Sequence, residues 1–186
     1  MRLEQRVMEI HRALDRGGIP HAFGGALALA YWILHPRGTA DIDVNIFVPA
    51  AECGRALKAL PDGVEQPDGT EVETRREGQI RLWWEGTPVD LFFDYAPIHG
   101  DAARDRVVVP FLDGEIPVLG PVELAVFKAM FDRTKDWADI EAIIAAQRLD
   151  LEAVRQALCE MLGPDDYRIA RLEEAKRLAT TPSPPG

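Results

Sequence analysis

A glycine pair followed by two closely spaced aspartates sets the tightest limits on how this chain can fold. Gly24 and Gly25 stand where a short apolar stretch passes into a strongly apolar helical pattern. After a break, Asp41 and Asp43 open a second apolar stretch, residues 41–48, which has the pattern of a strand. Side chains two residues apart on a strand point to the same face. The sequence therefore predicts two carboxylates that project together from an apolar ribbon.

Two neighbouring carboxylates need a compensating partner. They repel each other, so a close pair usually binds a cation, shares a proton or faces a basic group. Oxygen ligands favour a hard ion, and a carboxylate pair that also meets substrate phosphates suits Mg²⁺. The alternative is a pair of solvated aspartates on an edge strand, where charge discourages pairing with another sheet. Both interpretations are open on these two residues alone.

A third aspartate lies in another apolar segment. Residues 88–93 have the pattern of a strand, and Asp90 stands between Val89 and Leu91. A lone carboxylate is costly to bury unless it is paired or bound to a metal. Three carboxylates from two strands suit a phosphoryl-transfer site with two ions about 3.5–4 Å apart. Asp94 is the competing candidate, but its place at the strand end favours exposure to solvent.

The rest of the chain alternates helical and strand patterns and predicts an α/β (α+β) fold. Helices are predicted over residues 3–16, 26–34, 49–60, 137–146, 151–162 and 165–178, with another beginning at Pro121. Strands are predicted over 19–23, 41–48, 107–111 and 115–118, with a meander of two or three strands over 70–93. We expect a core over 1–120 that includes the N-terminal helix, a helical segment over 121–179 packed on it, and a disordered tail over 180–186.

Composition narrows the class of protein. The chain has 186 residues, 47% hydrophobic and 28% charged, as in ordinary globular domains. No apolar run approaches the roughly 20 residues of a membrane span, and the N-terminus lacks the apolar centre of a signal peptide. We therefore expect a cytoplasmic protein without a membrane partner. A net charge of -10 argues against nonspecific coating of nucleic acid, although a local basic cleft stays open.

The order of the motifs resembles the nucleotidyltransferase superfamily of the DNA polymerase β type. That pattern is matched by the Gly24-Gly25 pair, then Asp41 and Asp43, then Asp90 on a later strand. The resemblance implies a polymerase-β-like core with a mixed sheet flanked by helices. It implies an enzyme that transfers a nucleoside monophosphate from an NTP such as ATP to an acceptor hydroxyl. The aspartates would be catalytic and bind Mg²⁺, and the glycines would let the backbone approach the nucleotide.

The later part of the chain resembles the AbiEii-type branch of this superfamily. The matching residues are Glu123, Leu124, Lys128 and the run 133–140, with Arg37 and Thr39 ahead of the acidic pair. The resemblance implies that Arg37, Thr39 and Lys128 contact the nucleotide. It also implies a catalytic contribution from Lys128, which Asp136 would orient. The branch includes toxins of bacterial toxin and antitoxin pairs, some of which add nucleotides to tRNA ends, so a cognate toxin or antitoxin partner is expected.

Spacing alone leaves simpler roles open for these side chains. Lys128 has the alternative of a surface lysine that extends its ammonium into solvent. Lys135 and Asp139 have the i, i+4 spacing of an ordinary ion pair. Asp136 also suits the first turn of a helix, where an acid is favourable.

The acceptor is predicted from the placement of basic residues. Basic side chains are expected near the site in the sheet region and in the helix beyond it: Arg75, Arg76, Arg81, Arg104, Arg106, Lys128, Arg133 and Lys135. If they converge, they would hold the phosphates of an RNA 3′ end such as that of tRNA. If they are scattered, they balance nearby glutamates. The alternatives are then a small-molecule acceptor, as for antibiotic-modifying enzymes, or a catalytically silent antitoxin-like binding protein.

Overall fold

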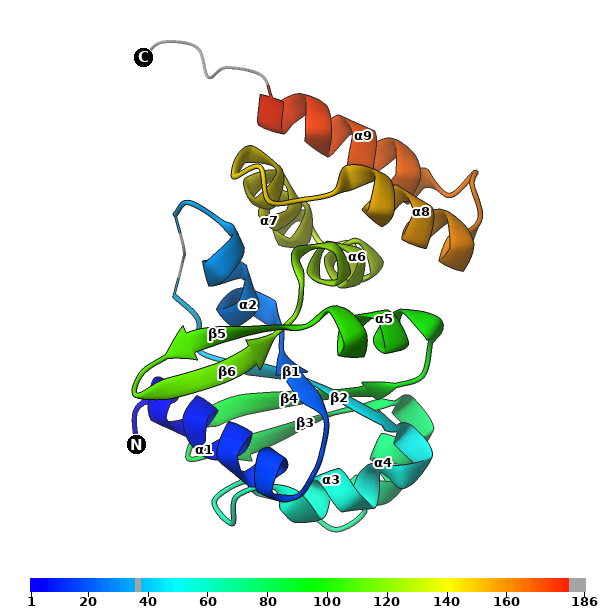
Figure 1. Cartoon of the computed structure of the whole chain (residues 1–186). Helices are drawn as coiled ribbons and strands as arrows, with labels where there is room; N and C mark the ends of the chain where they lie inside the picture. The colour runs from blue at the N-terminus through cyan, green and yellow to red at the C-terminus, as the bar shows by residue number, and fades with distance from the viewer. Residues whose placement is uncertain (36–37, 181–186) are drawn as a thin grey trace. The chain divides into compact units, whose positions relative to one another are not determined.

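The structure is a computed structural model that describes residues 1–35 and 38–180 (Figure 1). The chain divides into two compact units. The first comprises Met1–Leu27 and Gly38–Leu119, and the second comprises the rest of the described chain. Most of the predicted disordered tail, residues 181–186, lies outside the described residues, whereas Thr180 is the last residue of a helix.

The described residues of the first unit form a six-stranded mixed sheet, as predicted. Its strands are β1 (His21–Phe23), β2 (Ile42–Pro49), β3 (Gln79–Trp84), β4 (Thr87–Asp94), β5 (Val107–Phe111) and β6 (Gly114–Val118). They lie in the order β3-β4-β2-β1-β6-β5. The pairs β2–β4 and β1–β6 are parallel, and the other neighbours are antiparallel. Parallel neighbours need a crossover, so β2 and β4 come together from distant parts of the sequence.

Helices cover both faces of this sheet. They are α1 (Leu3–Arg16), the 3-10 turn η1 (Ala50–Glu52), α3 (Cys53–Ala59), α4 (Thr70–Glu77) and α5 (Pro97–Asp105). Figure 1 shows α1, α3 and α4 on one side of the sheet and α5 on the other. Every second side chain of β2 and β4 is buried in the core: Ile42, Val44, Ile46, Val89, Leu91 and Phe93. The residues between them, including both strand aspartates, therefore project from the opposite face.

Two helices in the first unit differ from the sequence expectation. The predicted meander over 70–93 was wrong at its start, because residues 70–77 form α4 and only β3 and β4 are strands. Charges at the ends of α4 complement the helix dipole: Glu71, Glu73, Arg75 and Arg76. Gly78 ends the helix in the left-handed conformation, with φ 69°. Helix α5 was not predicted, although Pro97 at its first turn is a typical helix start.

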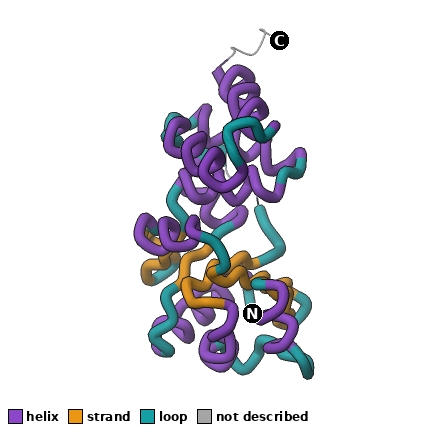
Figure 2. The backbone as a smooth tube through the Cα atoms, turned by 90° about the vertical axis from the view of Figure 1, so that its right-hand side faces the viewer, coloured by secondary structure: helices purple, strands orange, loops and turns teal. Residues whose placement is uncertain are grey.

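All the described secondary-structure elements of the second unit are helices (Figure 2). It contains the later part of α2 (Gly25–Trp32), then α6 (Pro121–Phe131), α7 (Thr134–Ala145), α8 (Leu151–Leu162) and α9 (Tyr167–Thr180). Asp132, in the left-handed turn between α6 and α7, accepts hydrogen bonds from Trp137 and Arg171 at 2.7 Å each and from Tyr167. These bonds tie α9 to the turn. Among the described helices, none is long and apolar enough to cross a bilayer.

Candidate active site

Three charged side chains stand in one row across three neighbouring strands. Asp43 of β2 lies opposite Asp90 of β4, and Asp90 lies opposite Arg81 of β3. Directly opposite residues of a sheet share a face, so the two carboxylates and the guanidinium project together. Arg81 donates from Nε to Oδ1 of Asp90 at 2.7 Å and from Nη2 to Oδ2 at 2.6 Å. One guanidinium therefore binds both oxygens of Asp90.

The position of Asp90 explains why it needs a partner. Asp90 is buried in the sheet, as predicted, and the Arg81 guanidinium supplies the compensating charge. The hydrogen bond to Asp90 and the charge of that carboxylate raise the pKa of Arg81 above its usual range. The charges of Asp41 and Asp43 raise the same pKa further. All three predicted site carboxylates thus act on one guanidinium.

Arg81 was not predicted as the partner of Asp90, although the sequence carries a local signal for this pair. β3 and β4 form a hairpin whose two turn residues, Glu85 and Gly86, have φ values of 47° and 78°. Two residues with positive φ are the mark of a tight type I′ hairpin turn. In such a hairpin, residues equally distant from the turn lie opposite each other, which places Arg81 against Asp90. Recognising the turn type would have predicted the pair.

Both predicted glycines lie against the strand that carries Asp43. The Gly24 amide donates to the Asp43 carbonyl at 2.9 Å, and a Cβ added to Gly24 would lie 2.7 Å from Nδ2 of Asn45. Gly25 begins α2 with φ +51°, and a Cβ there would lie 1.7 Å from Oδ2 of Asp43. The Asp43 carboxylate therefore occupies the space that any other side chain would need. The glycine pair is a steric requirement of this site.

Asp41 is placed differently from the expectation. The predicted strand begins one residue later, at Ile42, and Asp41 lies in a bend before it. The Thr39 hydroxyl donates to Oδ1 of Asp41, so a local hydrogen bond holds the chain out of the strand. The alternation of side chains along β2 thus begins only at Ile42, and the predicted common face of Asp41 and Asp43 stays a prediction. Arg37, the other predicted nucleotide contact in this segment, lies outside the described residues.

The oxygen ligands of this face suit a hard cation such as Mg²⁺. Asp43 and Asp90 place carboxylates side by side on neighbouring strands, and carboxylate oxygens are the ligands that Mg²⁺ prefers. Across residues 1–35 and 38–180, no three His, Cys, Asp or Glu side chains gather closely enough to hold a metal ion. Asp90 directs both oxygens to Arg81, and Asp41 binds Thr39. The oxygen donors suit the ion chemically, but the carboxylates of Asp90 and Asp41 bind Arg81 and Thr39 in this structure.

A separate charged cluster lies within the second unit. Lys128 of α6 donates to Oδ2 of Asp139 at 2.6 Å and lies 3.8 Å from Oδ1 of Asp136. All three side chains are buried. Asp136 is the third residue of α7 and also accepts from Nε of Arg133 at 2.6 Å. Asp139, expected to pair with Lys135, thus binds a lysine from the preceding helix instead.

The structure places both Asp136 and Lys128 in the interior of the helical unit. Asp136 stands in the first turn of α7 and beside Lys128, which agrees with both roles considered for it. The Lys128 ammonium does not extend into solvent, so the simple surface-lysine interpretation was wrong. Its predicted contact with nucleotide phosphates stays a prediction.

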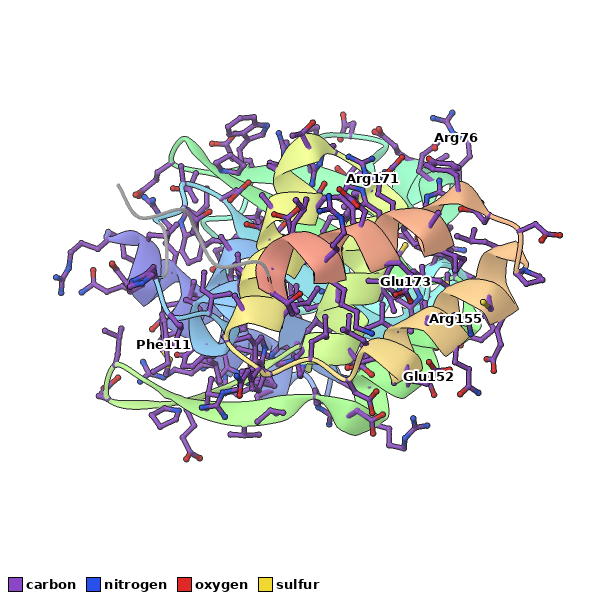
Figure 3. The ribbon with its side chains drawn as sticks, turned by 90° about the horizontal axis from the view of Figure 1, so that it is seen from above. Arg76, Phe111, Glu152, Arg155, Arg171 and Glu173 are labelled. Carbon is purple, nitrogen blue, oxygen red and sulfur yellow. The ribbon has the colours of Figure 1, made fainter. Side chains whose placement is uncertain are left out.

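The arginines expected in the sheet region lie mostly elsewhere. Arg75 and Arg76 belong to α4, and Arg104 belongs to α5. Each has a carboxylate partner nearby: Arg75 with Glu71, Arg76 with Glu77, and Arg104 with Asp101 and Asp105. Figure 3 shows Arg76 projecting outward from the ribbon. For these three arginines the scattered alternative holds, because exposed helices place acids and bases at neighbouring positions.

Comparison with solved structures identifies the class of fold. No protein-family model matches the sequence, and no curated relative matches it. An antigenic nucleotidyltransferase-like protein from Paracoccidioides brasiliensis aligns with TM-score 0.50 and 17% identity over 91% of this chain and 92% of that one. The antibiotic-resistance factor ANT(2'')-Ia aligns with TM-score 0.52 and 15% identity over 94% and 89%. In complex with adenylyl-2''-tobramycin it aligns with TM-score 0.50 and 14% identity over 96% and 98%. This chain therefore has a nucleotidyltransferase-like fold.

Proposed function

We propose that this chain is a metal-dependent nucleotidyltransferase that moves a nucleoside monophosphate from an NTP to an acceptor hydroxyl. The observation that carries the proposal is the pairing of Asp43 with Asp90 on neighbouring strands, directly beside the glycine start of α2. Two carboxylates in register contribute nothing favourable to an ordinary apolar core, because burying a charge is costly. The nucleotidyltransferase-like fold supports the same conclusion.

Each group of the predicted site has a distinct task in this proposal. Gly24 and Gly25 let the backbone approach the triphosphate, and the start of α2 faces its negative charge. Asp41, Asp43 and Asp90 would hold Mg²⁺, which neutralises phosphate charge and activates the acceptor hydroxyl. Arg37, Thr39 and Lys128 remain proposed contacts of the nucleotide.

A small-molecule acceptor is favoured over an RNA end. Three arginines proposed for RNA phosphates, Arg75, Arg76 and Arg104, already have carboxylate partners on their own helices. A solved structure of this fold, ANT(2'')-Ia, is a complex with adenylyl-2''-tobramycin, which supports a small acceptor. An RNA or tRNA 3′ end, with a cognate toxin or antitoxin as partner, is the second candidate because of the resemblance in residues 133–140.

Labelling experiments test both the reaction and the acceptor. The protein is incubated with each labelled NTP and Mg²⁺, once with a small-molecule extract and once with total cellular RNA. We expect label in the small-molecule fraction; label confined to RNA would move the proposal to the second candidate. Omission of Mg²⁺ should abolish labelling in either case.

Two variants test the site itself. Asp43→Asn and Asp90→Asn should each lower labelling at least about 100-fold, as expected when a group that stabilises transition-state charge is lost. Asp94→Asn, near the end of β4, is the matched control and should keep wild-type labelling. Full labelling by Asp43→Asn, with an unchanged circular dichroism spectrum, would refute the enzyme and favour a silent binding protein.

A further inference from the structure

Arg81 binds the carboxylate of Asp90, which the proposed reaction needs as a metal ligand. Both oxygens of Asp90 accept hydrogen bonds from its guanidinium, at 2.7 and 2.6 Å. Such two-bond pairs between a guanidinium and a carboxylate are the strong form of a charged hydrogen bond. A metal ion at Asp90 needs at least one of the same oxygens. The Arg81 guanidinium and the metal ion of the proposed reaction therefore compete for the carboxylate of Asp90.

The two members of this pair differ in their freedom to move. The Arg81 side chain is 55% exposed, whereas that of Asp90 is 13% exposed. β3 is the edge strand of the sheet, and β4 is held between β3 and β2. An exchange of partners at Asp90 would therefore move the long arginine side chain and leave the carboxylate in place.

The charges at this face attract cations. The carboxylates of Asp90, Asp41 and Asp43 all raise the pKa of Arg81, so they act together on one positive charge. After exchange, the guanidinium would stay tethered to β3 close to the ion. There it meets negative phosphate oxygens, to which arginine binds well.

We propose that Arg81 is a built-in counter-cation that holds Asp90 until a divalent metal ion displaces it, and that the freed guanidinium then binds the phosphates of the nucleotide. This inference rests on the proposed nucleotidyl transfer. Arg81 acts in it as a positioning residue that lowers the intrinsic metal affinity of the site. Metal bound without nucleotide is thereby disfavoured, whereas the phosphates of a bound nucleotide offer the displaced guanidinium a new partner.

Metal binding measured without turnover tests the competition. Mn²⁺ serves as the probe, and its affinity is measured by electron paramagnetic resonance on the full chain without nucleotide. Arg81→Gln should bind Mn²⁺ about 5- to 10-fold more tightly than wild type, because it loses both the competitor and a nearby positive charge. Arg76→Gln, with the same charge change on exposed α4, is the matched control and should leave the affinity unchanged.

A double-variant cycle separates competition at Asp90 from a general effect of charge. In the Asp90→Asn background, the gain in Mn²⁺ affinity from Arg81→Gln should shrink to the small part that the lost positive charge gives. A gain of the same size there would overturn the proposal, as would an Arg81→Gln variant that binds Mn²⁺ no more tightly than wild type. Circular dichroism confirms that each variant is folded.

The nucleotide part is tested by calorimetry with a nonhydrolysable NTP. The ratio of the affinity for the Mn²⁺ complex of this analogue to the affinity for Mn²⁺ alone should be several-fold lower in Arg81→Gln than in wild type. An equal ratio in both proteins would overturn this part of the proposal. If the Arg81 results fail while wild type still labels an acceptor, only this inference is lost. If wild type shows no metal-dependent labelling, the proposed function fails instead.

Discussion

The two units each contain a carboxylate and cation cluster, and the clusters differ in their access to water. At the sheet face, the Arg81 side chain is 55% exposed although its partner is nearly buried. In the helical unit, the Lys128 side chain is 7% exposed, and those of Asp136 and Asp139 are 1% and 9% exposed. The cation bound to Asp90 can move into solvent, whereas Lys128, the cation bound to Asp139, is buried.

Exposure decides what each cluster contributes. Removing one partner from a buried ion pair leaves an uncompensated charge in a poorly solvated place, which is strongly destabilising. An exposed partner is screened by water, and the pair adds at most about 1 kcal/mol to stability. We therefore expect the helical cluster to contribute more to the stability of the fold and the sheet cluster to exchange its cation during function.

The largest effect is expected from Lys128→Met. This change keeps an unbranched side chain but leaves Asp139 without its ammonium, so it should cost about 3–5 kcal/mol of unfolding free energy. Urea unfolding followed by circular dichroism measures the loss. The double variant Lys128→Met with Asp139→Asn should recover much of it, and Lys135→Met at an exposed position is the control. A loss below about 1 kcal/mol would show that the cluster is solvated after all.

The comparison can be sharpened with a buried titratable group in the sheet unit. His21 donates from Nδ1 to the Ile19 carbonyl at 2.8 Å, so its Nε2 accepts from Nδ1 of His11 at 3.0 Å. Burial lowers the pKa of His21 from 6.5 to about 4, and the charge of Arg106 contributes to the shift while that of Asp15 opposes it. Because the ring is buried and neutral, protonation favours the unfolded chain.

This depressed pKa sets the direction of a pH effect. The stabilising contribution is complete above about pH 6.5 and is lost as the pH falls toward 4, because the unfolded chain then binds more protons. The total amounts to about 3 kcal/mol. Unfolding free energies measured across this window should fall, and the fall should be much smaller in His21→Gln. Identical pH profiles for the two proteins would contradict the assignment to His21.

A smaller loss is expected from Gly25→Ala. The residue has φ +51°, and the new Cβ would lie 1.7 Å from Oδ2 of Asp43 unless the carboxylate or the start of α2 moves. The strain should cost about 1–3 kcal/mol, and labelling should fall because Asp43 is displaced. Gly38→Ala is the control, since a Cβ there meets no atom within 4 Å. Calorimetric melting and labelling are measured on both variants.

The smallest effect on stability is expected from Arg81→Gln. Because the guanidinium is more than half exposed, water can take its place beside Asp90, so its loss should change the unfolding free energy by only about 1 kcal/mol. The same urea experiment as for Lys128→Met gives a direct comparison of the two clusters. A loss as large as that of Lys128→Met would remove the distinction between them.

Local pattern in the sequence was sufficient for most elements and for the individual site residues. The alternation of apolar residues placed Asp43 and Asp90 on strands, and α1, α8 and β5 were predicted with the bounds that the structure has. The glycine pair was also recognised. These features depend on residues a few positions apart, and helix and strand periodicity reports such neighbours directly.

The tertiary structure alone decided which charges meet. The register that sets Asp43 beside Asp90 joins two parallel strands across a long crossover, and no local pattern specifies it. The burial of Lys128 against Asp139 depends on how α6 packs on α7. The energy of a charged side chain depends on its partner and on its access to water, both of which follow from the packing of distant segments.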